Sequence, residues 1–288
     1  MGSQNGVEAA LSADWLGAAR RSARAAREAL ALYPGATERR RETGRGEGGD
    51  MTLAIDRAVE DAVLDELAAV GVGIDAVSEE RGRVPLAGGG PALAVVDPID
   101  GSLNAKRRLR PFSLSIAIAG GPTMSDVEFG YVADLSSEDE WWARRGQGAC
   151  HGDPLFRGEA TSLSLPADPE LEILGVESAR PELVAAAGDA LTATGARRLR
   201  MMGSIALSLC HVAAGRFDGL VSLRPCRSVD AAAGQLIVRE AGGVVAFPDT
   251  ADGELGASLT LSMRSRVVAA PSATVFEQLG TLALPVPG

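Results

Sequence analysis

The chain has 288 residues, which is enough for one large domain or for two compact halves with a sizeable core. Its 28 basic and 38 acidic side chains give a net charge of −10, which argues against general binding to nucleic acid or to an anionic membrane. The three cysteines have no metal-ligand spacing, and their odd, low number favours a reducing compartment over a disulfide scaffold.

Absent motifs narrow the chemistry further. No signal-peptide pattern and no apolar run of membrane-spanning length occurs, so we expect a cytoplasmic protein. The strings HExxH, GxSxG, GxGxxG and GxxxxGK[ST] are also absent, and the chain has only two histidines. Any catalysis is therefore expected to rest on carboxylates.

The N-terminal part is predicted to be helical with one long loop. Residues 1–11 are expected to be a disordered tail, and residues 12–33 have the pattern of an alanine-rich helix. The polar, glycine-rich segment 36–50 is either a solvated loop or a mobile loop over a site. A second helix is expected over residues 50–70, with Asp56 in its first turns.

Two predicted strands deliver carboxylates at their ends. A strand near residues 73–77 leads to Glu79, and the apolar run 92–96 leads to the string Asp-Pro-Ile-Asp-Gly-Ser over residues 97–102. Carboxylate and carbonyl oxygens suit Mg²⁺, and free N–H groups at a turn or helix start suit a phosphate. A plain strand-ending turn is the alternative, but the paired carboxylates followed by Gly-Ser favour a metal site beside a phosphate site.

The remaining chain divides into a strand-rich part and an alternating part. The basic cluster over residues 106–110 is either a solvated turn or an anion-facing segment. An antiparallel meander is predicted next, followed by alternating strands and helices, so the fold class is α/β. We expect an N-terminal α+β half over 12–158 and a C-terminal α/β half over 159–288. Expected strands cover 112–119, 126–133, 140–144, 171–176, 197–202, 217–223, 244–247 and 267–270, and expected helices cover 182–194, 204–214, 228–241 and 273–282.

Two motifs together carry a family resemblance. They are the Asp-Pro-Ile-Asp-Gly-Ser string and Asp230 in Ser-Val-Asp-Ala-Ala-Ala-Gly. With them, the chain resembles the inositol monophosphatase family of Mg²⁺-dependent sugar-phosphate phosphatases over residues 12–282. The resemblance implies a layered αβαβα sandwich, with a mixed antiparallel sheet in the first half. It also implies two to three Mg²⁺ ions, a small phosphate substrate and a homodimer, with no nucleic-acid or membrane partner.

The resemblance also implies roles for individual residues. Glu79, Asp97 and the Ile99 carbonyl would bind one Mg²⁺, and a third, weaker ion would lie near Glu79. A second ion would be bound by Asp97, Asp100 and Asp230. Asp56 would orient the Ser102 hydroxyl, and this pair with Glu79 would position the attacking water. The residues implied in substrate binding are Asp100, Gly101, Ser102, Gly203, Ser204, Ile205 and Asp230.

The chemistry behind this implied cluster is general. Phosphate monoesters are anionic and repel hydroxide, so nearby cations neutralise the phosphoryl oxygens, activate a water and stabilise the leaving alkoxide. A single carboxylate is most simply a surface charge. Five carboxylates at strand ends and helix starts are better explained as metal ligands and their helpers.

The sequence departs from the family pattern in three places. Val229 stands where a tryptophan is usual, and Ser102 stands where threonine is commoner. The glutamate that contacts inositol in animal members falls on Ser222 or Leu223. Arg224 and Arg227 lie nearby instead, and arginines suit a second phosphate or a sugar carboxylate. The alternative is that both arginines lie on the surface or pair with Glu240 or Asp218.

Several functions therefore compete. A phosphomonoesterase acting on a small sugar or polyol phosphate is favoured, with inositol monophosphate as the default substrate. Fructose-1,6-bisphosphatase or a dual-specificity enzyme is the alternative, and histidinol phosphate and 3′-phosphoadenosine 5′-phosphate are weaker candidates. A non-catalytic sugar-phosphate-binding protein of the same fold is also considered, although intact metal ligands argue against it.

Overall fold

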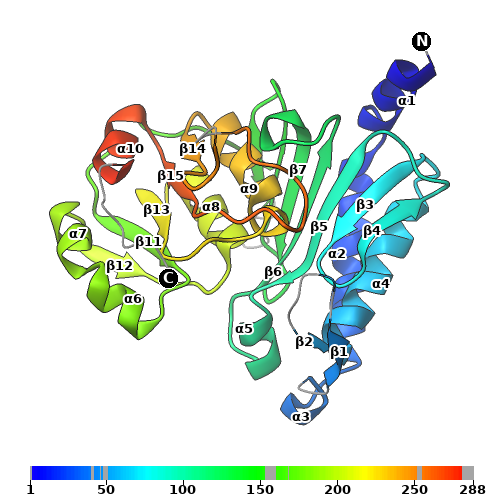
Figure 1. Ribbon diagram of the computed structural model, residues 1–288, viewed down its shortest axis with the longest axis horizontal. Coiled ribbons are helices and arrows are strands. Elements are labelled where there is room, and N and C mark those ends of the chain that lie inside the picture. The colour runs from blue at the N-terminus through cyan, green and yellow to red at the C-terminus, as the bar shows by residue number, and fades with distance from the viewer. Residues whose placement is uncertain are drawn as a thin grey trace.

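The computed structural model describes residues 2–39, 42–45, 47, 51–152, 160–167, 169–251 and 255–280. Its elements are arranged as α/β/α/β/α layers (Figure 1), which confirms the predicted α/β sandwich. An outer pair of helices covers one sheet, two helices lie between the sheets, and three more cover the second sheet. In that order the helices are α2 (Trp15–Ala31) and α4 (Ala54–Ala68), then α8 (Ile205–Ala213) and α9 (Ser228–Glu240), then α6 (Pro181–Ala186), α7 (Gly188–Ala193) and α10 (Ala273–Gly280).

The larger sheet has eight strands in the order β10-β9-β8-β7-β6-β5-β3-β4. Its strands are β3 (Ile74–Ser78), β4 (Gly82–Leu86), β5 (Leu93–Asp100), β6 (Ser113–Ala119), β7 (Val127–Asp134), β8 (Glu140–Arg144), β9 (Ala149–Gly152) and β10 (Thr161–Leu163). Strand β5 is parallel to β3 and antiparallel to β6. Every residue of β5 is buried, as expected for a strand covered by helices on both faces.

The smaller sheet has five strands in the order β12-β11-β13-β15-β14. Its strands are β11 (Ile173–Glu177), β12 (Arg198–Arg200), β13 (Gly219–Ser222), β14 (Val244–Ala246) and β15 (Val268–Ala270). Strand β11 is parallel to β12 and β13, whereas β15 is antiparallel to β13 and β14. This mixed sheet agrees with the α/β half expected from the sequence.

One apolar core joins the two sheets through the central helices. Residues of β5, β7, α8, α9 and β15 belong to the same buried cluster. Two glycines let the layers approach closely: a Cβ on Gly130 of β7 would lie 2.8 Å from the Ala233 carbonyl oxygen, and one on Gly234 would lie 2.7 Å from Leu209. This cluster contains residues of both predicted halves, and two further clusters lie within the first and the second half alone.

The N-terminal region differs from the expectation. The predicted tail is helix α1 (Gly2–Leu11), and the Trp15 indole N–H donates to the Ala10 carbonyl at 2.7 Å. Both of these residues are fully buried, so the end of α1 is held by tertiary packing that the polar start of the chain does not reveal. Asp14 caps the start of helix α2, and its side chain accepts from the Gly17 N–H at 2.9 Å.

The predicted loop over 36–50 also contains structure. Helix α3 (Ala36–Arg39) is followed by β1 (Glu42–Arg45), which pairs antiparallel with β2 (Met51–Leu53). Positions 40, 41, 46 and 48–50 lie outside the described residues, so the question of a mobile loop over the site stays a prediction for them. Arg39 donates to the Tyr33 and Ala105 carbonyls at 2.8 and 3.0 Å, and the second bond connects α3 to α5 (Ser102–Arg107).

Three other boundaries move. Strand β10 pairs with β9, so the first sheet extends past residue 158, and the helix expected over 182–194 is broken into α6 and α7. Strand β4 was not among the expected strands, and it forms by pairing with β3. A short 3₁₀ turn, η1, covers Met124–Asp126. All three cysteines are free thiols, and none of the described helices is long and apolar enough to cross a membrane.

Candidate active site

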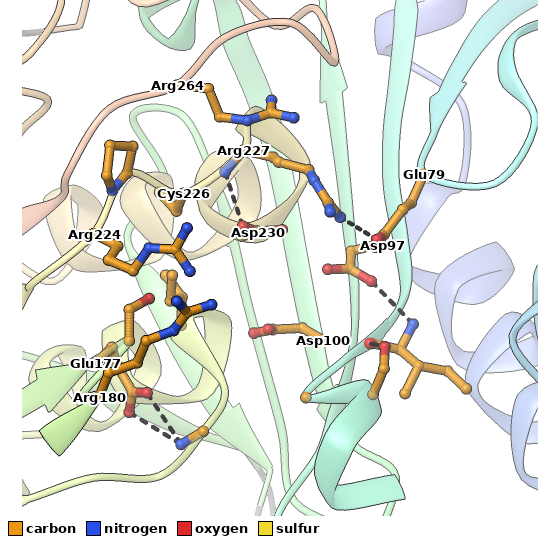
Figure 2. Close-up of a pocket in the computed structure, with 17 residues that line it drawn as sticks. Glu79, Asp97, Asp100, Glu177, Arg180, Arg224, Cys226, Arg227, Asp230 and Arg264 are labelled. Atoms are coloured by element: carbon orange, nitrogen blue, oxygen red, sulfur yellow. Dashed lines mark hydrogen bonds and ion pairs between the residues drawn. The ribbon is translucent and has the colours of Figure 1, made fainter. Parts of the chain in front are cut away.

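A polar pocket of about 640 Å³ lies where strands of both sheets end and central helices begin. The residue after β3 and the end of β5 line it from the larger sheet, and the end of β11 and the segment after β13 line it from the smaller one (Figure 2). Helices α8, α9 and the short α5 (Ser102–Arg107) start beside it. Backbone N–H groups at helix starts favour negative charge, so this edge of the molecule suits an anionic ligand.

A strand irregularity brings both carboxylates of the Asp-Pro-Ile-Asp string to the same pocket. In a regular strand, Asp97 and Asp100 would point to opposite faces. The pairing of β5 with β6 shifts between these two residues, since Asp97 pairs with Ser115 whereas Asp100 pairs with Ser113. Such a bulge re-aims side chains, and here both aspartates line the pocket. The Asp97 carboxylate accepts the Ile99 N–H at 3.0 Å, which fixes this turn.

Gly101 then turns the chain into α5. Its φ of 97° is left-handed, and a Cβ there would lie 2.9 Å from the Gly203 carbonyl oxygen of the second half. Only glycine fits this contact between the two halves. Ser102 follows at the first position of α5, and its hydroxyl donates to the Ile99 carbonyl at 2.9 Å.

Asp100 is held by the start of α8. Its Oδ2 atom accepts from the Ser204 hydroxyl and from the Ala206 N–H, both at 2.7 Å. Ser204 also caps α8 by accepting the Leu207 N–H at 3.2 Å. Burial, together with the charge of Asp230, nevertheless raises the pKa of Asp100 to about 8.

Asp230 and Glu79 complete an acidic group. Asp230 lies in the first turn of α9, where its side chain accepts the Arg227 N–H at 2.8 Å. Glu79, just after β3, forms an ion pair with the Arg227 guanidinium. Burial raises the pKa of Glu79, Asp97 and Asp230. For Glu79 and Asp97, the charges of neighbouring carboxylates raise the pKa further.

This acidic group has the donor chemistry of a magnesium site. Buried carboxylates that repel one another are costly unless a cation compensates them. The oxygens of Glu79, Asp97, Asp100 and Asp230, with the Ile99 carbonyl, are hard ligands that fit Mg²⁺. Across the described residues, no three Asp, Glu, His or Cys side chains are yet gathered in the arrangement of a metal centre. The acidic residues would therefore have to draw closer together to hold an ion.

The opposite wall of the pocket carries arginines. Arg224 and Arg227, which the sequence singled out, line it together with Arg180 and Arg264, which sequence reasoning missed (Figure 2). Arg180 closely follows the end of β11, so the strand-end rule that found Glu79 could also have found it. Arg264 lies in an irregular segment that offered no such signal.

Glu177 at the end of β11 was also missed. It is buried, and its carboxylate accepts from the Met202 and Gly203 N–H groups at 2.8 and 3.0 Å and from the Ser208 hydroxyl at 2.6 Å. These bonds stabilise the segment that precedes α8. Glu177 therefore supports the floor of the pocket.

Most of the predicted site residues share this pocket. Those that line it are Glu79, Asp97, Ile99, Asp100, Gly101, Ser102, Gly203, Ile205, Arg224 and Asp230. Ser204 does not line it, because this side chain is 1 % exposed and lies beneath Asp100. Its hydroxyl donates to Asp100 instead, and a contact between Ser204 and substrate stays a prediction.

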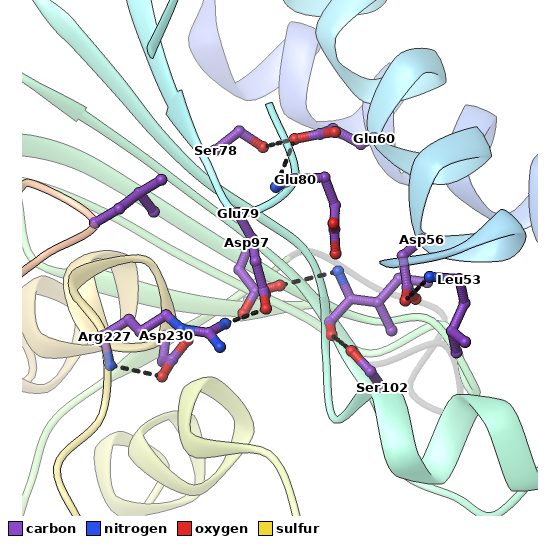
Figure 3. Close-up of polar contacts among 12 residues, drawn as sticks. Leu53, Asp56, Glu60, Ser78, Glu79, Glu80, Asp97, Ser102, Arg227 and Asp230 are labelled. Atoms are coloured by element: carbon purple, nitrogen blue, oxygen red, sulfur yellow. Dashed lines mark hydrogen bonds and ion pairs between the residues drawn. The ribbon is translucent and has the colours of Figure 1, made fainter. Parts of the chain in front are cut away.

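Asp56 lies beside the pocket rather than in it (Figure 3). One carboxylate oxygen accepts the Leu53 N–H at 3.2 Å, and the other is buried without a hydrogen bond from any described residue. Burial is the main reason that the pKa of Asp56 is raised to about 7. The predicted Asp56–Ser102 hydrogen bond is absent, because Ser102 donates to Ile99 within its own turn.

Other sequence features do not contribute to the pocket. Residues 107–110 of the basic cluster are exposed and do not line it, which favours the solvated turn. Ser222 and Leu223 are buried, and Ser222 accepts the Val267 N–H at 2.8 Å. Neither residue can replace the inositol-contacting glutamate of animal family members. Val229 packs in the core.

Comparison with known proteins places the chain in a family. The profile of the inositol monophosphatase family matches residues 12–283. A fructose-1,6-bisphosphatase/inositol-1-monophosphatase from Methanothermobacter thermautotrophicus is 31 % identical over 275 residues, or 92 % of this chain and 95 % of that protein. Human inositol monophosphatase 2 is 31 % identical over 243 residues, or 81 % of this chain and 78 % of that protein.

Solved structures agree with the fold. The crystal structure of the extragenic suppressor protein SuhB from Bartonella henselae has a TM-score of 0.74 at 22 % identity. It covers 94 % of this chain and 99 % of the matched chain. The pocket of buried carboxylates thus occurs in a shared architecture, and the chain belongs to the inositol monophosphatase family of phosphatases.

Proposed function

We propose that the protein is a Mg²⁺-dependent phosphomonoesterase that hydrolyses a small sugar or polyol phosphate, with inositol monophosphate as the default substrate. The observation that carries this proposal is the group of carboxylates gathered from both halves at one pocket. Glu79, Asp97 and the Ile99 carbonyl would hold one ion. Asp97, Asp100 and Asp230 would hold a second, and a third, weaker ion would lie near Glu79.

The chain's own groups would bind and orient the phosphate. Bound Mg²⁺ supplies positive charge that neutralises phosphoryl oxygens and lowers the pKa of water. The N–H groups of Gly101 and Ser102 lie where α5 begins and would donate hydrogen bonds to the phosphate oxygens. The Ser102 hydroxyl lines the pocket, whereas Asp56 would need to turn toward it to orient that hydroxyl. The pocket floor at Gly203 and Ile205 would contact the leaving group.

A second candidate substrate carries another anionic group. Arg180, Arg224 and Arg264 are exposed at the pocket and face the acidic residues across it. Arginine side chains bind phosphate and carboxylate groups through paired N–H donors. This observation favours a bisphosphate such as fructose 1,6-bisphosphate, or the dual specificity that the names of several archaeal relatives describe.

Phosphate release from a substrate panel tests both candidates. The panel contains inositol 1-phosphate, fructose 1,6-bisphosphate, histidinol phosphate and 3′-phosphoadenosine 5′-phosphate, each assayed with Mg²⁺ and with EDTA. We expect turnover with Mg²⁺ and loss of turnover in EDTA. Undiminished hydrolysis in EDTA would rule out the metal mechanism, and binding without phosphate release would identify a sugar-phosphate-binding protein.

The assembly and location are also proposals. The family resemblance suggests a homodimer, and the composition suggests the cytoplasm. Light scattering coupled to size exclusion measures the first, and a monomer at assay concentration would contradict it. Localisation of a tagged full-length chain measures the second.

A further inference from the structure

Glu60 is a fully buried carboxylate that neither the proposed metal site nor the proposed substrate site uses. It lies on α4 one turn after Asp56, so both side chains lie on the same face of the helix. A buried charged group is costly unless it is hydrogen-bonded, and an apolar residue of similar size would fill the same space at lower cost. Its contacts therefore need an explanation.

Those contacts surround a single neighbour, Glu79. The Glu60 Oε1 atom accepts from the Ser78 hydroxyl and from the N–H groups of Glu80 and Arg81, at 3.3 and 3.2 Å for the two amides (Figure 3). Ser78 is the last residue of β3 and is itself fully buried. One carboxylate oxygen thus collects donors from both sides of Glu79 along the chain.

Glu60 is not the only restraint on the turn at Glu79, because Arg81 also forms an ion pair with Asp61 and the Glu80 carbonyl accepts the Glu47 N–H at 3.3 Å. Residues 79–81 leave the sheet between β3 and β4, so the ladder hydrogen bonds of those strands do not hold them. The Glu79 side chain extends the other way, into the pocket, where it meets Arg227 and the charge of Asp230. Neighbouring carboxylates repel Glu79 whereas Arg227 attracts it, so the direction of this side chain also depends on how firmly the turn is held.

We infer that Glu60 is a positioning residue that holds the turn from Ser78 to Arg81 so that the Glu79 carboxylate faces Asp97 and Asp230. Part of this inference rests on the proposed function, because it takes metal binding as the reason why the Glu79 carboxylate is held in this position. Groups that orient metal ligands through hydrogen bonds commonly affect metal affinity by about 10–100-fold. Glu60 acts one step further back, through the backbone of the ligand.

The first experiment measures divalent-ion affinity directly. Mg²⁺ binding is followed by calorimetry and Mn²⁺ binding by electron paramagnetic resonance, on full-length Ser78→Ala, Glu60→Gln and Glu60→Ala. We expect an affinity loss of about tenfold for Glu60→Ala, with smaller losses for the other two, because Ser78→Ala removes one donor and Gln keeps an acceptor. Ser22→Ala is the matched control, since Ser22 is equally buried on α2 and its hydroxyl has no hydrogen bond with any described residue.

A double-mutant cycle separates positioning from general loss of stability. If Glu60 and Ser78 act through Glu79, then Ser78→Ala should change metal affinity less than about twofold in a Glu79→Gln background. A readout without metal is amide hydrogen exchange, which should become faster at Glu80 and Arg81 in Glu60→Ala while exchange in β5 stays unchanged. Should Glu60→Ala fail to fold, Ser78→Ala and Glu60→Gln still provide the cycle.

The outcomes distinguish the inference from the proposed function. Equal metal affinity in the wild type and in folded Glu60→Ala would overturn the positioning role and leave the phosphatase proposal intact. An equal loss in Ser22→Ala, or a loss that persists at full size in the Glu79→Gln background, would also overturn it. A wild-type chain that binds no divalent ion would instead refute the metal part of the proposed function, and the inference with it.

Discussion

The two walls of the pocket are built differently. The acidic wall (Glu79, Asp97, Asp100 and Asp230) lies at strand ends and at the start of α9, and three of its carboxylates accept backbone N–H groups. The basic wall (Arg180, Arg224, Arg227 and Arg264) comes from irregular segments, and three of its arginines are exposed. Arg227 belongs to both, because its N–H holds Asp230 while its guanidinium pairs with Glu79.

This difference suggests a division of labour. A reaction needs groups held by rigid elements, whereas substrate choice is commonly set by residues on loops. We therefore expect the acidic wall to control the rate with every substrate. The basic wall should control which leaving group is accepted.

The largest expected effect comes from the acidic wall. Asp97→Asn or Asp230→Asn should lower kcat about 10³-fold or more on every substrate, because several kcal/mol of charge stabilisation is lost. Phosphate release with saturating Mg²⁺ measures this. Asp65→Asn, at an exposed position on α4, is the control and should retain activity. If the loss of kcat differed between substrates, the acidic wall would not control the rate with every substrate.

A smaller loss is expected where the acidic wall meets α5. Ser102→Ala should lower kcat about 10²-fold while changing KM little, if its hydroxyl acts mainly in the transition state. Steady-state kinetics on the preferred substrate measure both constants. A change confined to KM would instead assign Ser102 to substrate binding, in keeping with its present hydrogen bond to Ile99.

The basic wall should discriminate between substrates. Arg224→Ala should slow hydrolysis of a bisphosphate about 10–100-fold more than that of a monophosphate, since a charge-assisted hydrogen bond contributes roughly 1.5–3 kcal/mol. The kcat/KM ratio for the two substrates measures this. Arg197→Ala is the matched control, because Arg197 is an exposed arginine paired with Glu170 outside the pocket. Equal losses on both substrates would return the protein to a plain monophosphatase.

The smallest expected effect concerns His211, which lies outside both walls of the pocket. It tests whether a loss of stability at low pH arises from this histidine rather than from the carboxylates. Burial, with the charge of Arg216, lowers the pKa of His211 to about 4. The unfolded chain therefore binds a proton first as the pH falls, so stability is present above about pH 6.5 and is lost between there and pH 4. His211→Gln should lose less melting temperature than the wild type between pH 7 and pH 5.

His151→Gln is the control for this last measurement, because the chain has only two histidines. His151 pairs with Asp139 and is not expected to reproduce the difference. If His211→Gln and the wild type lose the same melting temperature, the acid sensitivity arises from carboxylates instead.

The sequence by itself determined the fold class and most of the acidic wall. Apolar runs followed by carboxylates are local patterns, so β3, β5 and their Glu79, Asp97 and Asp100 could be located from composition and spacing. Asp230 was singled out differently, through the family motif at the start of a predicted helix, and its role was implied by that resemblance. These residues could be predicted because strand ends and helix starts are local features of the sequence.

Tertiary structure alone decided the rest, since it depends on contacts between distant segments. Arg180 and Arg264 join the pocket only because β11 packs against α8 and Ser265 pairs with Cys226 just before α9. Ser204 becomes a support because Asp100 reaches it across the sheets. Local geometry likewise gave Ser102 a nearer partner than Asp56. The core cluster shared by the two halves arises because α9 is buried on both sides. The periodicity of one helical segment can show that it is buried, but it cannot show which elements pack against it.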